Sequence, residues 1–316
     1  MNKVLILGNS NIANKRVIPA LSSICSVGSI EIASKKNTPS LIGKITKIYN
    51  SYQDALESFD GDLVYISLPN HLHDKYLKMA IDNKLNCVVD KPAILHPDTL
   101  DYLKSKNTDN KIIAESVVFM EHSAWKSLLY ELNGPSNISK VIGNFMIPEL
   151  DTNNFRMNKE FFGGALNDMS AYAMGIGRWL WNSSPKNIKI GNVEIDNGLI
   201  KSFSFIADYG LNRVSMGSFG FGYEYLNNVT MIGKNSWGGY DRVFSPPPDL
   251  TISISGKKKN DPWIRETEKE DSFKIFLEKI LNDINLNEKG DWFKMVENTF
   301  SDHLKLANEI KKWREL

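Results

Sequence analysis

Short apolar runs separated by helical spacing characterise the first third of the chain. The run at residues 63–68, Leu-Val-Tyr-Ile-Ser-Leu, is largely apolar on both faces of a strand and too short for a helix. Runs of this kind are typical of parallel strands that are covered on both sides. We therefore expect a doubly wound parallel sheet, with strands at residues 4–7, 27–33, 44–49, 63–68, 86–89 and 111–114 and helices at residues 12–21, 51–58, 73–83 and 96–105.

The pattern changes after about residue 120. We expect strands at residues 139–145, 187–195, 199–207, 213–219, 228–232 and 250–255, and helices at residues 123–131, 164–180, 271–282 and 291–313. Several of these strands are bounded by Gly, Asn or Pro, as antiparallel hairpins are. Residues 257–259, all lysines, are expected in a solvated loop. The sequence thus predicts an α/β protein in which residues 1–119 form the domain with the parallel sheet. Residues 120–316 are expected to form an α+β domain with a large, mostly antiparallel open sheet.

The composition narrows the classes of function. The chain has 316 residues, 38 Lys and Arg against 37 Asp and Glu, and a formal net charge of +1. Such a balance is unlike that of a nucleic-acid-binding protein or a polybasic membrane anchor. Two cysteines and five scattered histidines give no disulfide framework and no metal-ligand spacing, so we expect no metal.

Targeting signals are not expected either. The apolar run at residues 4–7 is shorter than the roughly 7–15 residues of a signal sequence. No run approaches the ~20 apolar residues of a membrane span. We therefore expect a cytoplasmic protein whose partners are neither nucleic acids nor membranes.

A loop joins the first expected strand to the first expected helix, and dinucleotide-binding proteins carry the fingerprint G-x-G-x-x-G/A at this position. There, backbone N–H groups and the positive end of a helix dipole face a pyrophosphate. Gly8 and Ala13 fit the fingerprint, whereas Ser10 replaces its middle glycine and narrows the approach. We predict that the cofactor contacts Gly8, Asn9, Ser10, Asn11 and Ile12; a plain strand–helix turn is the alternative.

The tip of the second expected strand bears on the choice of cofactor. An Asp or Glu at this tip would bind the ribose 2′-hydroxyl of NAD. The tip instead carries Ser34, Lys35 and Lys36, and a hydroxyl with two cations suits a 2′-phosphate. We predict NADP(H) rather than NAD(H); in the alternative interpretation the two lysines lie in a solvated loop.

Four further polar segments follow in order. Leu68-Pro69-Asn70-His71-Leu72-His73 comes after the fourth expected strand, Asp90-Lys91-Pro92-Ala93 after the fifth, and Glu115 after the sixth. The second domain contributes Gly163-Gly164-Ala165-Leu166-Asn167-Asp168-Met169-Ser170-Ala171-Tyr172.

Together with the loop at residues 8–13, this series resembles the glucose–fructose oxidoreductase/inositol dehydrogenase (Gfo/Idh/MocA) family of NAD(P)-dependent oxidoreductases. The family pattern is a Rossmann loop, L-P-N-x-x-H, E-K-P-x-A and G-G-G-A-L-x-D-x-G-x-H/Y, and the resemblance covers roughly residues 3–182. It is greatest to the nucleotide-linked 3-keto-sugar reductases, which share the run at residues 12–21 and a tyrosine at the position of Tyr172. Asp90, Ser170 and Met120 depart from the pattern, where the family has Glu, Gly and, in many members, Arg.

The second-domain motif places two polar side chains together. Asp168 and Tyr172 are four residues apart on one expected helix, so they share a face. Gly163 and Gly164 before this helix permit a tight turn and a close backbone approach. We predict that this face meets the carboxyl edge of the parallel sheet, where Lys91 projects and where ligands of such sheets bind.

Reduction of a ketone needs a hydride, which a nicotinamide cofactor supplies, and a proton, which the protein supplies. We predict that Tyr172 donates the proton and that Lys91 polarises the carbonyl and favours the phenolate form of Tyr172. Asp168 is expected to hydrogen-bond a sugar hydroxyl or to orient Lys91. In the alternative interpretation, Tyr172 is a core tyrosine and Asp168 a structural residue.

The other predicted site residues face the cofactor or the substrate. For the cofactor these are Leu68, Pro69, Asn70, His73, Asp90, Lys91 and Glu115. Arg156 is expected to contact a phosphate or hydroxyl group of the substrate, beside Asp168 and Tyr172.

Three functions remain open at this point. The first is the NADP(H)-dependent reduction of a keto-sugar, either free or linked to a nucleotide. The second is the oxidation of a cyclic polyol, sugar or dihydrodiol by the same site, and the third is a non-catalytic cofactor-binding protein on the same fold. The resemblance also implies a homodimer or homotetramer that assembles through the sheet of the second domain.

Overall fold

The computed structural model describes residues 1–35, 40–107, 109 and 111–315, and the chain divides into two compact units. The first unit comprises Met1–Ser116 and Phe273–Glu297, and the second comprises Val117–Ser272 and Asn298–Leu316. The expected boundary after residue 119 lies three residues beyond the first unit. Residues 273–297, however, pack with the first unit rather than the second, so a single boundary does not describe the chain.

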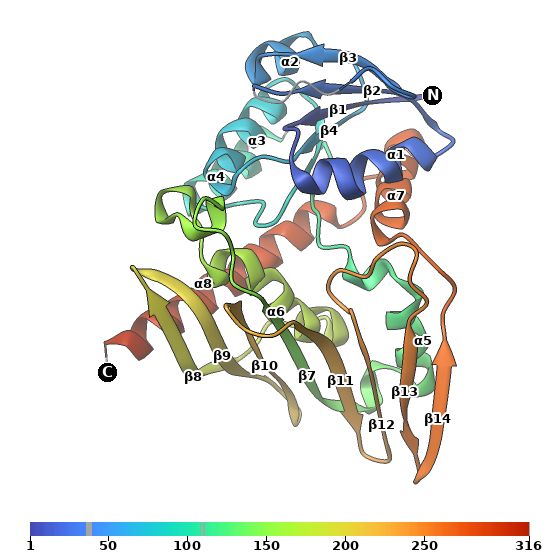
Figure 1. The fold of residues 1–316 in the computed structure, drawn as a ribbon, viewed down its shortest axis with the longest axis vertical. Helices are drawn as coiled ribbons and strands as arrows, with labels where there is room; N and C mark the ends of the chain where they lie inside the picture. The colour runs from blue at the N-terminus through green and yellow to red at the C-terminus, as the bar shows by residue number, and fades with distance from the viewer. Residues whose placement is uncertain (36–39, 108, 110, 316) are drawn as a thin grey trace. The chain divides into compact units, whose positions relative to one another are not determined.

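A six-stranded parallel sheet forms the centre of the first unit, in the order β3-β2-β1-β4-β5-β6 (Figure 1). Its strands are β1 (Asn2–Leu7), β2 (Val27–Ala33), β3 (Ile45–Tyr49), β4 (Leu63–Ile66), β5 (Asn86–Val89) and β6 (Ile113–Glu115). The four residues of β4 are all buried, as expected for a strand that is covered on both faces. The strand order reverses between β1 and β4, and ligands of such sheets bind where this reversal occurs.

Helices cover this sheet: α1 (Ile18–Ser23), α2 (Tyr52–Ser58), α3 (His73–Asp82), α4 (Pro97–Lys106) and α7 (Ser272–Leu286). The first helix differs from the sequence expectation, because it begins with a π-helical turn over Ala13–Val17. Pro19 lies near the start of α1 and has no N–H to donate to a preceding carbonyl, so the regular helical ladder is interrupted there. Side-chain contacts join α7 to the rest of the unit. The Arg16 guanidinium lies 4.9 Å from the Phe273 ring centroid, and Asn2 donates to Asn285 at 2.8 Å.

An eight-stranded sheet dominates the second unit, in the order β14-β13-β12-β11-β7-β10-β9-β8. Its strands are β7 (Ile138–Ile147), β8 (Asn187–Asp196), β9 (Leu199–Gly210), β10 (Arg213–Phe221), β11 (Leu226–Gly233), β12 (Ser236–Asp241), β13 (Ser253–Lys258) and β14 (Asp261–Glu266). Only the β7–β10 pairing is parallel among those described, so the sheet is mostly antiparallel as expected. The unit also holds α5 (Ser123–Glu131), α6 (Ala165–Trp181) and the part of α8 (Trp292–Arg314) that follows Asn298.

The periodicity of the sequence did not predict β12 and β14. A β-carbon on Gly238 would lie 2.7 Å from the Trp263 ring, and one on Gly256 would meet that ring at the same distance. The indole of Trp263, on β14, therefore occupies the space above these two glycines. Because β12 has a glycine where an apolar side chain would otherwise face the core, its sequence does not alternate between apolar and polar residues. The expectation for residues 257–259 was partly wrong, because Lys257 and Lys258 belong to β13.

None of the helices in the described part of the chain is both long enough and apolar enough to cross a membrane.

Candidate functional site

The turn after β1 has the backbone that the phosphate loop requires. Gly8 has φ +104°, a conformation that L-residues with a side chain rarely adopt. A β-carbon at this position would also lie 2.2 Å from the carbonyl oxygen of Ser67, at the end of β4. Glycine is therefore required at position 8, and the loop lies where the strand order reverses. This backbone fits a dinucleotide pyrophosphate.

Ser10, which stands where the fingerprint has its middle glycine, turns its side chain back toward the sheet. Its Oγ lies 2.7 Å from the Oγ of Ser67 and accepts a hydrogen bond from the N–H of Ala13 at 3.0 Å. The side chain of Asn14 donates to the Asn9 side chain at 2.7 Å, which closes the loop further. The hydroxyl of Ser10 thus has partners inside the protein, so its presence is compatible with a ligand on the outer side of the loop.

The tip of β2 carries the residues that we predict for the 2′-phosphate. Ser34 is buried, and its N–H donates to the carbonyl of Tyr49 at 2.9 Å. The Lys35 ammonium lies 5.2 Å from the ring centroid of Tyr52, which is within the range of a cation–π contact. Burial raises the pKa of the Tyr52 phenol. Lys36 lies outside the described residues.

A turn that is held on both sides follows β5. The Asp90 carboxylate accepts hydrogen bonds from the Tyr65 hydroxyl at 2.7 Å and the Ser67 hydroxyl at 2.6 Å. Lys91 comes next, and the Lys91–Pro92 peptide bond is cis. The N–H of Ala93 then donates to the Glu115 carboxylate at 2.8 Å, so the backbone around the lysine is fixed from two neighbouring strands.

His73 occupies a different environment from the one we predicted. Its ring is 0% exposed, with Nδ1 2.8 Å from the carbonyl oxygen of Pro92 and Nε2 2.7 Å from that of Leu68. Both ring nitrogens thus lie within hydrogen-bond distance of a backbone carbonyl oxygen. His73 therefore joins the turn after β4, which contains Pro69 and the buried Asn70, to the turn after β5.

Two glycines set the start of α6 in the second unit. The N–H of Gly164, at φ +91°, donates to the carbonyl of Arg156 at 2.7 Å. A β-carbon on Gly163 would lie 2.3 Å from the same carbonyl oxygen. The short helical turn Phe155–Met157 can therefore lie against the beginning of α6 only because these two positions are glycines.

Asp168 and Arg156, both predicted to bind substrate, contact each other. The Arg156 Nε donates to the Asp168 carboxylate at 3.0 Å, and Asp168 is 8% exposed. The guanidinium also lies 4.6 Å from the ring centroid of Phe155. The sequence did not reveal this ion pair, because its members are twelve positions apart and the chain changes direction between them at the glycine turn.

Tyr172 lies one turn after Asp168 on α6 and is also 8% exposed. Its ring centroid is 5.0 Å from that of Phe244, 5.7 Å from Phe145 and 6.1 Å from Phe119. These phenylalanines come from three separate segments, and no motif marked them. The aromatic cluster fixes the plane of the Tyr172 ring. A fixed ring is compatible both with a proton donor and with a core tyrosine.

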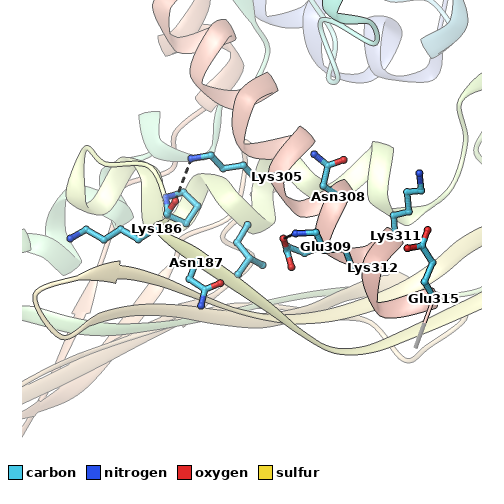
Figure 2. A pocket seen from close by; sticks show the side chains of 10 residues that line it. Lys186, Asn187, Lys305, Asn308, Glu309, Lys311, Lys312 and Glu315 are labelled. Atoms are coloured by element: carbon cyan, nitrogen blue, oxygen red, sulfur yellow. Dashed lines mark hydrogen bonds and ion pairs between the residues drawn. The ribbon is translucent and has the colours of Figure 1, made fainter.

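A hollow elsewhere in the second unit contains none of the predicted site residues among those that line it. It lies between the start of β8 and the last turns of α8, and Figure 2 shows the lysines around it, Lys186, Lys305, Lys311 and Lys312. Lys305 donates to the Ser184 hydroxyl at 2.6 Å, and Lys312 forms an ion pair with Glu309. Because none of the predicted site residues lines the hollow, it is not the candidate site.

Comparisons with known proteins agree with this arrangement. Residues 3–114 match the Gfo/Idh/MocA oxidoreductase family, which has an NAD-binding Rossmann fold. The chain is 22% identical over 256 residues to the dTDP-3,4-didehydro-2,6-dideoxy-alpha-D-glucose 3-reductase of Streptomyces violaceoruber, covering 78% of this chain and 74% of the relative. It is 25% identical over 217 residues to D-xylose 1-dehydrogenase (NADP(+)) 2 of Haloferax volcanii, covering 65% of each.

The fold is also that of KijD10, a 3-ketoreductase from Actinomadura kijaniata whose structure was solved in complex with NADP and TDP-benzene. The TM-score is 0.85 over 94% of each chain, at 18% sequence identity. This likeness confirms the predicted fold class, a Rossmann-type parallel sheet followed by a large, mostly antiparallel one. The match to the Gfo/Idh/MocA family covers residues 3–114, and the relatives named above are reductases and dehydrogenases, so the protein is an NAD(P)-dependent oxidoreductase that is similar to this family.

Proposed function

We propose that the protein transfers a hydride from NADPH to the keto group of a sugar, with nucleotide-linked 3-keto-sugars as its substrate class. The observation that carries this proposal is the turn after β5. Asp90 is anchored on one side of Lys91 and Ala93 on the other, so the lysine stands on fixed backbone. A cation held in this way can stabilise charge on a substrate oxygen without reorganising during the reaction.

The hydride comes from the reduced nicotinamide, and the protein supplies the proton that completes the reduction. In our proposal the O–H bond of Tyr172 breaks and its proton moves to the alkoxide oxygen, which was the carbonyl oxygen. Lys91 acts on the same oxygen, and its positive charge favours the phenolate that the transfer leaves behind. Asp168, held by Arg156, is assigned to a sugar hydroxyl.

The preference for NADP(H) rests on the tip of β2. This tip offers the Ser34 hydroxyl and the Lys35 ammonium and has no carboxylate to bind a ribose 2′-hydroxyl. The complex of KijD10 with NADP supports the same assignment. The substrate class is supported by the names of the relatives, which are a dTDP-sugar 3-reductase and a D-xylose dehydrogenase.

The similarity to a D-xylose dehydrogenase also favours a second candidate, the oxidation of a sugar or polyol with NADP⁺. The same residues would serve it, because Tyr172 as phenolate accepts the proton that it donates in the reduction. A protein that binds the cofactor without turnover is the third possibility, which the experiment below distinguishes.

We also propose that a second copy of the chain covers the open face of the second sheet. Ile206, Met216, Ile142 and Thr230 face one another across β9, β10, β7 and β11. Ile206 is 48% exposed, whereas its neighbours Phe205 and Ala207 are buried on the opposite face. Met216, Ile142 and Thr230 are half-buried, and a partly exposed, largely apolar row of this kind is typical of a surface that packs against another copy.

The test begins with fluorescence titrations of the purified protein with NADPH and NADH, repeated on Ser34→Asp. We expect tighter binding of NADPH by the parent protein and a shift toward NADH in the variant, because a carboxylate repels the 2′-phosphate. Equal binding of both cofactors by the parent protein contradicts the NADP assignment. Turnover is then measured with D-xylose and NADP⁺ and with a dTDP-3-keto-sugar and NADPH. Binding of cofactor without turnover on a wider panel of ketones and polyols favours the non-catalytic alternative.

A further inference from the structure

A chain of hydroxyl groups joins the phosphate loop to the turn that carries Lys91. The N–H of Ala13 donates to Ser10 Oγ at 3.0 Å, and Ser10 Oγ lies 2.7 Å from Ser67 Oγ. The hydroxyl of Ser67 donates to the Asp90 carboxylate at 2.6 Å. Three successive hydrogen bonds thus connect the first turn of helix after β1, the end of β4 and the end of β5.

The far side of the carboxylate is anchored as well. The Tyr65 hydroxyl lies 2.7 Å from the second oxygen of Asp90 and 2.9 Å from the Ser116 hydroxyl. Tyr65, Ser67 and Ser116 are all buried, so water competes little for these hydrogen bonds. The arrangement therefore spans the carboxyl ends of β1, β4, β5 and β6.

The chemistry of the carboxylate fixes the direction of every proton. The carboxylate oxygens of Asp90 accept hydrogen bonds from Ser67 and Tyr65, so each of these hydroxyls donates its one O–H hydrogen to Asp90. Ser10 must then donate to Ser67, and Ser116 must donate to Tyr65. Both branches run toward the same carboxylate, and hydrogen bonds aligned in this way strengthen one another.

We infer that Ser67 is a positioning residue that couples cofactor binding at the phosphate loop to the placement of Lys91. The inference rests on the proposed function, which gives Lys91 its role. A pyrophosphate that orders the loop orders Ser10, and through Ser67 it orders the carboxylate that immediately precedes the lysine. Ser10 and Asp90, which are two of the positions that depart from the family pattern, are then the two ends of one connection.

The backbone beyond Lys91 makes this connection effective. The carbonyl of Pro92 contacts His73, and the N–H of Ala93 donates to Glu115, so that side of the turn is already fixed. The carboxylate of Asp90 is held by hydroxyl groups alone in the hydrogen bonds described above. Loss of one of these hydroxyls therefore changes the orientation of the lysine rather than the fold of the turn.

A binding experiment tests the coupling without any substrate. The dissociation constant of NADPH is measured by fluorescence for Ser67→Ala, Tyr65→Phe and the double variant. Ser67→Ala is expected to raise it about tenfold, as the loss of buried hydrogen bonds to a charged group does. Tyr65→Phe acts from the far side of Asp90 and is expected to raise it about threefold in the parent protein. In the Ser67→Ala background, where the hydrogen-bond chain is already broken, Tyr65→Phe should change the dissociation constant of NADPH less than about 1.5-fold.

The control is Tyr102→Phe, which removes the same kind of bond, a tyrosine hydroxyl donating to Asp82 at 2.6 Å, between α4 and α3. It should leave the constant within about 1.5-fold of the parent value. An equal effect of Tyr65→Phe in both backgrounds, or no effect in either, overturns the inference. If Ser67→Ala does not fold, Ser10→Ala takes its place, because it cuts the same branch at the loop.

Turnover separates a positioning role from a merely structural one. At saturating NADPH, Ser67→Ala should lower kcat about tenfold with little change in the KM of the sugar. It should cause no further loss when Lys91→Met is already present. If Lys91→Met itself leaves kcat unchanged, the proposed function fails. The NADPH titrations still decide whether the hydroxyl chain couples cofactor binding at the phosphate loop to Asp90.

Discussion

A buried ion pair between α6 and α8 offers a quantitative test of how the helix that carries Asp168 and Tyr172 is held. Arg178 on α6 donates two hydrogen bonds to Asp302 on α8, at 2.6 Å and 2.7 Å. The Asp302 side chain is 1% exposed and the Arg178 side chain 11%. The Ser184 hydroxyl also donates to Asp302, at 2.8 Å.

Replacement of Arg178 by an apolar residue of similar length measures the free-energy cost of burying the Asp302 carboxylate without its partner. In Arg178→Met, Asp302 keeps the Ser184 hydroxyl but loses both charge-assisted bonds, and a buried charge that loses its partner costs about 3–5 kcal/mol. We expect Arg178→Met to lower the free energy of unfolding by that amount. The double variant Arg178→Met/Asp302→Leu removes the stranded charge, so it should be less destabilised than Arg178→Met alone.

The assay is urea unfolding followed by tryptophan fluorescence and far-ultraviolet circular dichroism, which together show whether the two units unfold in one transition. Lys312→Met, which removes an ion pair with Glu309 on the exposed side of α8, is the control and should cost less than about 1 kcal/mol. A loss below about 1 kcal/mol in Arg178→Met, or a double variant less stable than that single variant, refutes the reasoning.

Three further predictions concern the loop, pH and assembly. Gly8→Ala should abolish detectable NADPH binding in a fluorescence titration, because its β-carbon would lie 2.2 Å from a backbone oxygen and φ is +104°. Burial lowers the pKa of His303, whose Nδ1 lies 2.8 Å from Ser170 Oγ, to about 4 from its ordinary 6.5. The folded protein therefore resists a proton that the unfolded chain binds, so stability should fall as the pH drops from about 6.5 to about 4. The loss should reach about 2–3 kcal/mol in urea titrations and should be smaller in His303→Gln. Ile206→Lys should shift the protein toward monomer in sedimentation velocity, and an unchanged distribution contradicts assembly through this sheet face.

Much of the fold follows from local sequence, and the exceptions have physical causes. The strand β4 is a continuous apolar run, and β2 and β5 match the expected residues throughout. The sequence did not predict β12, because the apolar group that packs on its glycine Gly238 is the ring of Trp263, which is distant in sequence. The packing of α7 with the first unit depends on contacts such as that between Arg16 and Phe273, which no local pattern encodes.

The candidate site residues come from the sequence, and the structure adds their surroundings. Motif order indicated Gly8, Lys91, Asp168 and Tyr172, and the structure gives each of the first three a defined backbone or side-chain setting. The partners of these residues were not predictable. The hydroxyls that hold Asp90 and the rings around Tyr172 come from segments far apart in sequence, and each is an ordinary core residue when viewed alone. The motif indicated His73 as a cofactor-binding residue, whereas both of its ring nitrogens contact backbone carbonyl oxygens inside the protein.

The central claim is that Tyr172 gives its proton to the substrate oxygen. It is tested most directly by comparing Tyr172→Phe with the parent protein in the rate of NADPH oxidation, at saturating NADPH, on the ketone that the parent reduces fastest. The variant keeps the ring and its aromatic packing, so a large change reports the hydroxyl alone. The account predicts a kcat at least about 100-fold lower, with NADPH binding unchanged, as the loss of a general acid does. An undiminished kcat contradicts it and leaves Tyr172 as a core tyrosine.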